Sequence, residues 1–232
     1  MADFDLALLT TGPYHAQLVA GFWLSLKLAA GTLVLALPLA LVVAMLRLTP
    51  SRLLNGVGFG FVEAIRNVPL LAHILFWYFG APELLPEGIK QWLYRGSIEV
   101  ASAVVALTLY TAAYMSEDIR SGVRSVPREQ LEAARALGFG FMKSMRLVVL
   151  PQALRITVPP LISQCLSLWK NTSMAMVVGV AELLYQAQQV ESATFRSFEA
   201  FAFATAGYLS VSLVITGLAV LYEHRLHVRG RR

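Results

Sequence analysis

The sequence has little charge and almost no cysteine. Only 14% of its 232 residues are charged, whereas 57% are hydrophobic and the mean hydropathy is +0.62. A chain of this composition is too apolar for an ordinary soluble domain. The single cysteine, Cys165, excludes an intrachain disulfide and a cysteine-based metal cluster. The four histidines are scattered and show no convincing metal-ligand spacing.

Catalytic and nucleotide-binding motifs are also absent from the sequence. Lys143-Ser144 follows Met142 and not the glycine that a phosphate-binding loop requires. Gly56 and Gly60 do not fit a dinucleotide fingerprint, and their i, i+4 spacing is more typical of closely packed transmembrane helices. H-E-x-x-H and G-x-S-x-G motifs do not occur. If the chain takes part in ATP-driven work, the ATPase is therefore another polypeptide.

Long hydrophobic segments are what the sequence has in quantity. A membrane-spanning helix needs about 20 predominantly apolar residues. Five segments meet or approach this length: 18–46, 57–79, 98–115, 158–184 and 201–221. We predict an all-α transmembrane protein in which residues 1–232 form a single domain. The first segment is long enough to cross the bilayer with a tilt.

The positive charges alternate between the two sides of the predicted membrane. Thirteen lysines and arginines lie after the first and third spans and in the C-terminal tail, whereas only Lys90, Arg95 and Arg196 lie in the other loops. The positive-inside rule then places the N-terminus in the periplasm and the C-terminus in the cytoplasm. The net charge of +5 is explained by topology and anionic lipid headgroups, with no nucleic-acid partner.

The loop 121–158 contains a segment with strong helix signals. Pro127 suits the first turn, acidic Glu129 and Glu132 favour the N-terminal end, and Gly138 suits the left-handed position beyond the C-terminal end. We predict a helix of two to three turns, followed by an apolar segment that Pro151 ends. Either this helix lies on the membrane surface, or it docks into a partner as a coupling helix.

Polar residues interrupt two of the spans. They are Arg66, Asn67 and Pro69 in the second span and Lys170, Asn171 and Thr172 in the fourth. A cation at the membrane centre costs about 2.5–3.5 kcal/mol on insertion scales, so these side chains should face protein, water or substrate. Pro69 cannot donate a hydrogen bond to the carbonyl of Ile65, which predicts a kink or break there. We treat the six residues as a candidate translocation path.

Each buried charge also has a purely structural interpretation. Glu63 precedes Arg66 by three residues and can pair with it on one helix face. Lys170 can pair with a carboxylate of a partner subunit or donate to carbonyl groups at a helix end. The functional alternative is that Arg66 or Lys170 attracts the carboxylates of an anionic amino acid. Glu182, at the outer end of the fourth span, is either a gate or a capping contact with the fifth span.

Several motifs recur in the order typical of one known family. Glu132-Ala-Ala-Arg-Ala-Leu-Gly138 is followed by Val149-Leu-Pro-Gln-Ala153, Pro159-Pro160 and Lys170-Asn-Thr-Ser173. This order resembles the EAA-loop signature of bacterial ABC-importer permeases, and most closely the polar amino-acid branch. Two further segments, Arg66-Asn-Val-Pro-Leu70 and Pro82-Glu-Leu-Leu-Pro-Glu87, look like the glutamate/aspartate permeases. The resemblance covers nearly the whole chain.

The resemblance implies a five-helix, type I (MetI-like) permease of the bacterial inner membrane. It would work with a second permease subunit, where a heterodimer is favoured and a homodimer remains open. A cytoplasmic ATPase dimer would bind ATP and Mg²⁺, and a periplasmic protein would deliver an acidic amino acid. The permease itself would be non-catalytic and hold no cofactor. The residues implied in the ATPase contact are Glu132, Ala133, Ala134, Leu137 and Gly138.

Two other functions are weighed against this one. An ion-coupled secondary transporter of small polar solutes predicts inverted repeats and buried carboxylates within the spans, and the sequence shows neither. A membrane-embedded enzyme needs clustered catalytic groups near one interface, and none is apparent. Five spans are also few for a complete carrier.

Overall fold

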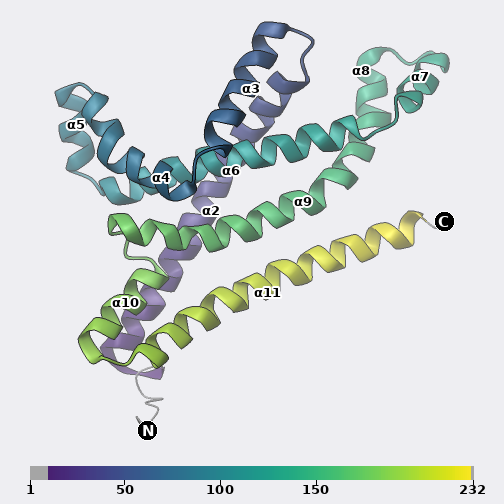
Figure 1. The fold of residues 1–232 in the computed structure, drawn as a ribbon. Coiled ribbons are helices and arrows are strands. Elements are labelled where there is room, and N and C mark those ends of the chain that lie inside the picture. Colours follow the sequence, from purple (N-terminus) through teal and green to yellow (C-terminus); the bar gives the residue numbers. More distant parts are fainter. Residues whose placement is uncertain (1–9, 231–232) are drawn as a thin grey trace.

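The computed structural model describes residues 10–230, and every regular element in that range is a helix. Four helices are long and apolar enough to cross a membrane: α2 (Gly12–Leu48), α6 (Ile98–Arg124), the run Met142–Val178 that contains α9, and α11 (Ser197–Gly230). A bent pair formed by 52–66 and 70–84 supplies a fifth crossing if it counts as one span. The predicted all-α membrane fold is confirmed (Figure 1).

α2 and α6 pack against each other through small side chains. Ala36 and Ala40 on α2 and Ala112 on α6 are fully buried, and Met115 fills the space beside them. Small residues let two membrane helices approach closely, so that dispersion contacts accumulate along the interface. With 37 residues, α2 is about 55 Å long and exceeds the thickness of the hydrocarbon core. The other faces of α6 carry α9 and the bent second span.

The second span is broken where the sequence predicts it. α3 (Arg52–Arg66) is followed by α4 (Leu70–Leu75), and the helical segment 70–84 that α4 begins is bent by 99° from α3. The chain then continues through the π turn η1 (Phe76–Gly80), the 3-10 turn η2 (Ala81–Leu84) and the short helix α5 (Glu87–Tyr94). The Glu83 carboxylate lies 2.7 Å from the Lys90 Nζ and, through this hydrogen bond, raises the pKa of the lysine.

The fourth span starts earlier and ends earlier than predicted. The elements here are α7 (Arg128–Ala136), α8 (Phe141–Ser144), the π turn η3 (Met145–Val149), α9 (Leu150–Asn171) and the 3-10 turn η4 (Thr172–Val178). Helix runs unbroken from 142 to 178, so the expected stop at Pro151 is wrong. The physical reason is the π turn, in which Leu150 N donates to the Met145 carbonyl and the register shifts just before the proline.

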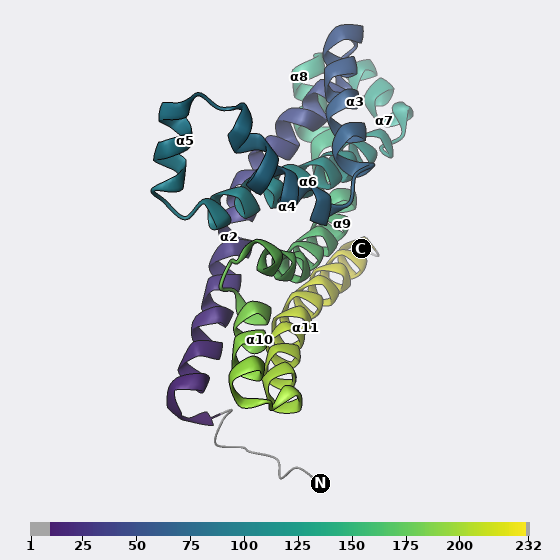
Figure 2. The ribbon, with the colours of Figure 1, turned by 60° about the vertical axis from the view of Figure 1, so that its left-hand side comes forward.

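The predicted segment 158–184 therefore covers two elements. Its helix ends at Gly179, which has a φ of +89°, and the last two residues lie at the start of the next helix. That helix is α10 (Leu183–Thr194), which lies alongside the first turns of α2 and the beginning of α11 (Figure 2). Its buried contacts are Leu183, Ala187 and Val190 against Leu18.

The two ends of the described chain lie far apart. α2 begins beside α10, whereas α11 runs from there toward the opposite end of the bundle (Figure 1). Which end faces the periplasm stays a prediction. The tail residues Arg231 and Arg232, and the side chains of Arg225 and Arg229, lie outside the described part of the chain.

Gly21 marks a close approach between α2 and α10. A Cβ atom there would lie 2.7 Å from the Gln186 Cγ and 3.0 Å from the Glu182 carbonyl oxygen, whereas a Cβ at Gly31 of the same helix would meet nothing within 4 Å. Gly21→Ala is expected to destabilise the protein by about 1–3 kcal/mol through overpacking. Thermal unfolding in detergent measures this, with Gly31→Ala as the matched control. Equal melting temperatures for the two variants would contradict the close packing.

Candidate functional site

The end of α7 is shaped by one glycine. Gly138 has a φ of +80°, and its backbone N donates to the Arg135 carbonyl at 2.9 Å. The next backbone N, of Phe139, donates to the Ala134 carbonyl at 3.1 Å. These two bonds make a Schellman motif, in which the residue just past the helix must be left-handed. The helix therefore ends in the geometry that the sequence predicts, and the chain turns sharply toward α8.

The five residues that the resemblance assigns to an ATPase contact differ in how exposed their side chains are. Glu132, Ala133, Leu137 and Gly138 are exposed, and Leu137 is exposed to 76%. Ala134 is 3% exposed, so its side chain packs within this chain where α7 lies against η3. Four of the five residues are thus available to a partner. The small side chain of Ala134 instead allows α7 to pack closely against the rest of this chain.

The break at Pro69 is closed by a histidine that the sequence analysis passed over. Since Pro69 has no N–H, the Ile65 carbonyl loses its usual helical donor. The His73 Nε2 lies 3.0 Å from that carbonyl oxygen and supplies the missing hydrogen bond. His73 is buried, and the Ile65 carbonyl otherwise accepts a long hydrogen bond from Val68 N at 3.5 Å, so the histidine strengthens a weakly paired helix end. The signal in the sequence is the position of His73, one helical turn after the proline.

A polar pocket of about 250 Å³ lies between α6 and α9. None of its lining side chains is charged, and most of them can form hydrogen bonds. They are Tyr110, Thr111 and Tyr114 from α6 and Gln164, Ser167, Leu168 and Asn171 from α9. Behind the pocket, Gln164 Nε2 donates to Asp118 Oδ2 at 2.9 Å, which joins the two helices.

Arg66 lies at the rim of this pocket. Its Cζ is 4.7 Å from the centre of the Tyr114 ring, a cation–π geometry. Within residues 10–230, no carboxylate oxygen lies within 4 Å of the Arg66 guanidinium nitrogens. The Glu63–Arg66 pair considered from the sequence does not form, because Glu63 Oε2 accepts a hydrogen bond from Asn67 Nδ2 at 2.9 Å. Arg66 thus presents an available positive charge.

The other predicted path residues take different places. Asn171 lines the pocket, whereas Lys170 is exposed beside it and does not belong to the lining. Thr172 is fully buried, and its Oγ1 donates to the Trp169 carbonyl. The structure therefore places Asn171 in the pocket lining and Arg66 against Tyr114, another lining residue, while Asn67 and Pro69 shape the break beside Arg66. Tyr110, Tyr114 and Gln164 were missed, although the two tyrosines share a helix face at i, i+4 spacing.

Glu182 is the centre of a second buried polar group. It is fully buried, and its Oε1 accepts a hydrogen bond from Tyr185 N, which caps α10. Its Oε2 accepts from Ser25 Oγ on α2 at 3.2 Å and from Tyr208 Oη on α11 at 2.5 Å. The capping contact with the fifth span, one of the two roles considered for Glu182, is present. It joins three helices at the end of the bundle far from α7.

Comparison with known proteins identifies this arrangement. The family model described as "Binding-protein-dependent transport system inner membrane component" matches residues 36–228. The chain belongs to this family of ABC-transporter permeases. The permease is 32% identical over 222 residues to the glutamate/aspartate import permease GltJ of Escherichia coli, covering 94% of this chain and 90% of the relative. It is 37% identical over 208 residues to the probable glutamine permease GlnM of Bacillus subtilis, covering 89% and 91%.

Other similarities extend the same conclusion. The permease is 34% identical to the nopaline transport permease NocM of Agrobacterium fabrum, covering 93% of this chain and 90% of that one. Among solved structures, an amino acid ABC transporter crystallised with histidines matches at a TM-score of 0.84 and 28% identity, over 97% of this chain and all of that one. The methionine transporter MetNI matches at 0.65 and 20%, which shows the fold alone. The permease is an inner-membrane subunit of an amino-acid ABC importer.

Proposed function

We propose that this permease imports acidic amino acids, glutamate or aspartate, and that Arg66 attracts the substrate carboxylate. The observation that carries the proposal is the available guanidinium of Arg66 at the rim of a pocket lined by uncharged polar groups. An anionic side chain gains a charge-assisted hydrogen bond from such a group. A basic substrate finds no carboxylate in the pocket lining and is repelled by Arg66.

The pocket has polar groups for the rest of an amino acid. The hydroxyl and amide groups of Tyr114, Gln164 and Asn171 can bond the substrate's polar atoms, and Asp118 behind Gln164 balances an α-ammonium group. The names of the relatives described above support a polar amino acid but differ among glutamate/aspartate, glutamine and nopaline. Glutamine, which fits the neutral lining without using Arg66, is therefore the competing substrate.

The driving force would come from a partner ATPase dimer that binds ATP and Mg²⁺. The exposed residues of α7 are charged or polar except for the small side chains of Ala133 and Ala136, and Leu137 lies just past its end, whereas a helix lying on a membrane buries a broad apolar face. This favours docking into a protein groove over the membrane surface. Closure of the ATPase dimer would move α7, and the packed helices would carry that movement to the pocket and alternate its access. The importer would be completed by a second permease subunit and a periplasmic binding protein. We favour a heterodimer, in which the second subunit is a different chain.

Uptake competition tests the substrate. The complex is reconstituted in liposomes with its ATPase and binding protein, and labelled glutamate is imported in the presence of excess aspartate, glutamine or arginine. The proposal predicts that aspartate competes strongly, glutamine weakly and arginine not at all. Stronger competition by glutamine than by aspartate would assign the pocket to a neutral amino acid instead.

A further inference from the structure

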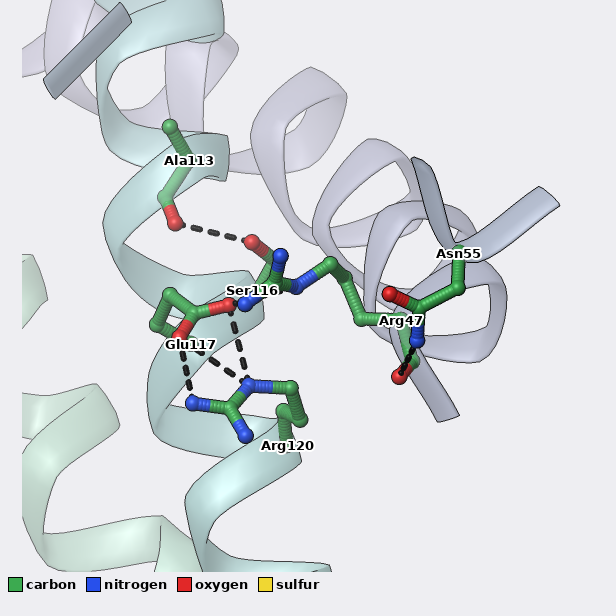
Figure 3. Close-up of polar contacts among 6 residues, drawn as sticks. All are labelled: Arg47, Asn55, Ala113, Ser116, Glu117 and Arg120. Atoms are coloured by element: carbon green, nitrogen blue, oxygen red, sulfur yellow. Dashed lines mark hydrogen bonds and ion pairs between the residues drawn. The ribbon is translucent and has the colours of Figure 1, made fainter. Parts of the chain in front are cut away.

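A compact charge cluster lies in the second half of α6, toward Arg124, and its residues do not line the pocket. Glu117 on α6 accepts hydrogen bonds from Arg120, one turn further along the same helix, at 2.7–3.1 Å (Figure 3). The Nε of Arg47, near the end of α2, lies 3.2 Å from Glu117 Oε1. The side chains of Arg47, Glu117 and Arg120 are only 11%, 15% and 21% exposed. One carboxylate thus neutralises one of two enclosed guanidinium charges.

Arg47 also holds the beginning of α3. Its carbonyl oxygen accepts a hydrogen bond from Asn55 Nδ2 at 2.7 Å (Figure 3). Its Cζ lies 4.9 Å from the centre of the Phe59 ring. Gly58 gives this side chain room, since a Cβ there would lie 3.1 Å from the Arg47 Cγ. On α3, therefore, Gly58 packs closely within this chain, whereas a Cβ at Gly56 or Gly60 would meet nothing within 4 Å. Arg47 thus joins the end of α2 to α3 and to α6.

Arg47 contacts both α6 and α3. α6 leads to α7, and α3 leads to the polar pocket. Beyond Glu117, α6 continues without a break to Arg124 and reaches α7 after three residues. α3 ends at Arg66, at the rim of the pocket. α6 is also held to α9 near α7, because a Cβ at Gly122 would lie 1.9 Å from Thr157 Oγ1. Movement of α7 thus has a packed route into α6. α6 also contacts α3 directly, and the Arg47–Glu117 ion pair is a charged link from α6 through the end of α2 to the beginning of α3.

We propose that the Arg47–Glu117–Arg120 cluster is a positioning element that transmits movement of α7 along α6 to α3 and thereby to Arg66. The proposal rests on the proposed ATP-driven function. Without the carboxylate, two enclosed guanidinium groups face each other unpaired, and their repulsion separates the ends of α2 and α6. The ATPase would still bind and hydrolyse ATP, but α3 would no longer follow α6.

The test measures coupling and not activity alone. Wild-type and Glu117→Gln complexes, each with ATPase and binding protein, are placed in liposomes, and both ATP hydrolysis and uptake of labelled glutamate are followed. The expected result is at least about a fivefold increase in ATP hydrolysed per molecule imported, a size typical of coupling between sites. The matched control is Glu83→Gln, which removes the carboxylate from an ion pair whose Glu83 side chain is 60% exposed; its ratio should equal that of the wild type.

Exchanging the charges of Arg47 and Glu117 distinguishes a role in coupling from a role in folding. The double variant Arg47→Glu, Glu117→Arg restores opposite charges between α2 and α6 and should recover at least part of the wild-type ratio, whereas each single variant should not. If Glu117→Gln does not assemble, Glu117→Asp, which keeps the charge but shortens the reach, serves in its place. An unchanged ratio in an assembled variant, or single and double variants that behave alike, overturns the proposal. Failure of the wild type itself to import glutamate would overturn the proposed function instead.

Discussion

Leu137→Asp is expected to abolish ATP-driven uptake while leaving the permease folded. Leu137 is an apolar side chain, 76% exposed at the end of α7, and a charge there makes no contact within the chain. If α7 enters a groove on the ATPase, an aspartate would have to be buried without a partner. Loss of a central interface residue costs about 2–4 kcal/mol, which is about a 30- to 1,000-fold loss of affinity. Co-purification of the tagged ATPase with the permease measures the effect directly.

Leu84→Asp is the matched control for this variant. Leu84 is 79% exposed but lies at the end of η2, far along the chain from α7. The control should retain the ATPase, and both variants should melt at the wild-type temperature. Retention of the ATPase by Leu137→Asp at wild-type strength would show that α7 does not dock in this way and would return the membrane-surface interpretation to favour.

Arg66→Ala is expected to reduce glutamate uptake by about thirtyfold or more. The Arg66 guanidinium lies over the ring of Tyr114, which lines the polar pocket. Removing a cation that pairs with a desolvated carboxylate costs at least about 2 kcal/mol. Arg66→Lys keeps the charge but loses the forked geometry of the guanidinium, so its uptake rate should lie between those of the wild type and Arg66→Ala. Initial uptake rates over a range of glutamate concentrations give the comparison.

Lys170→Ala and Lys27→Ala test whether the loss of uptake is specific to Arg66. Lys170 is exposed next to Asn171 but does not line the pocket, and Lys27 is an exposed cation on α2. Lys27→Ala should transport normally, and Lys170→Ala should lose less than Arg66→Ala. If only Lys170→Ala fails, the substrate carboxylate binds Lys170. If all three variants transport normally in intact complexes, neither Arg66 nor Lys170 binds the substrate.

Local signals in the sequence predicted local geometry well. The helix α7 and the left-handed Gly138 were predicted because a helix end depends on residues within one or two turns of it. The break at Pro69 was predicted for the same reason, since a missing N–H affects a carbonyl four residues away. Pro151 shows the limit of this reasoning. A π turn in the preceding residues accommodates the proline, and the sequence carries no clear mark of that turn.

Hydropathy, charge and ordered motifs in the sequence by themselves determined the membrane fold and the family resemblance, and they predicted the docking segment, because each of these signals lies in contiguous residues. Only the tertiary structure decided which polar groups meet. The pocket joins Tyr114 to Gln164, and the charge cluster joins Arg47 to Glu117, across separations of 50 residues or more along the chain. Such pairs depend on how α2, α6 and α9 pack, and close packing is set by the shapes of whole helix faces, which no single segment specifies.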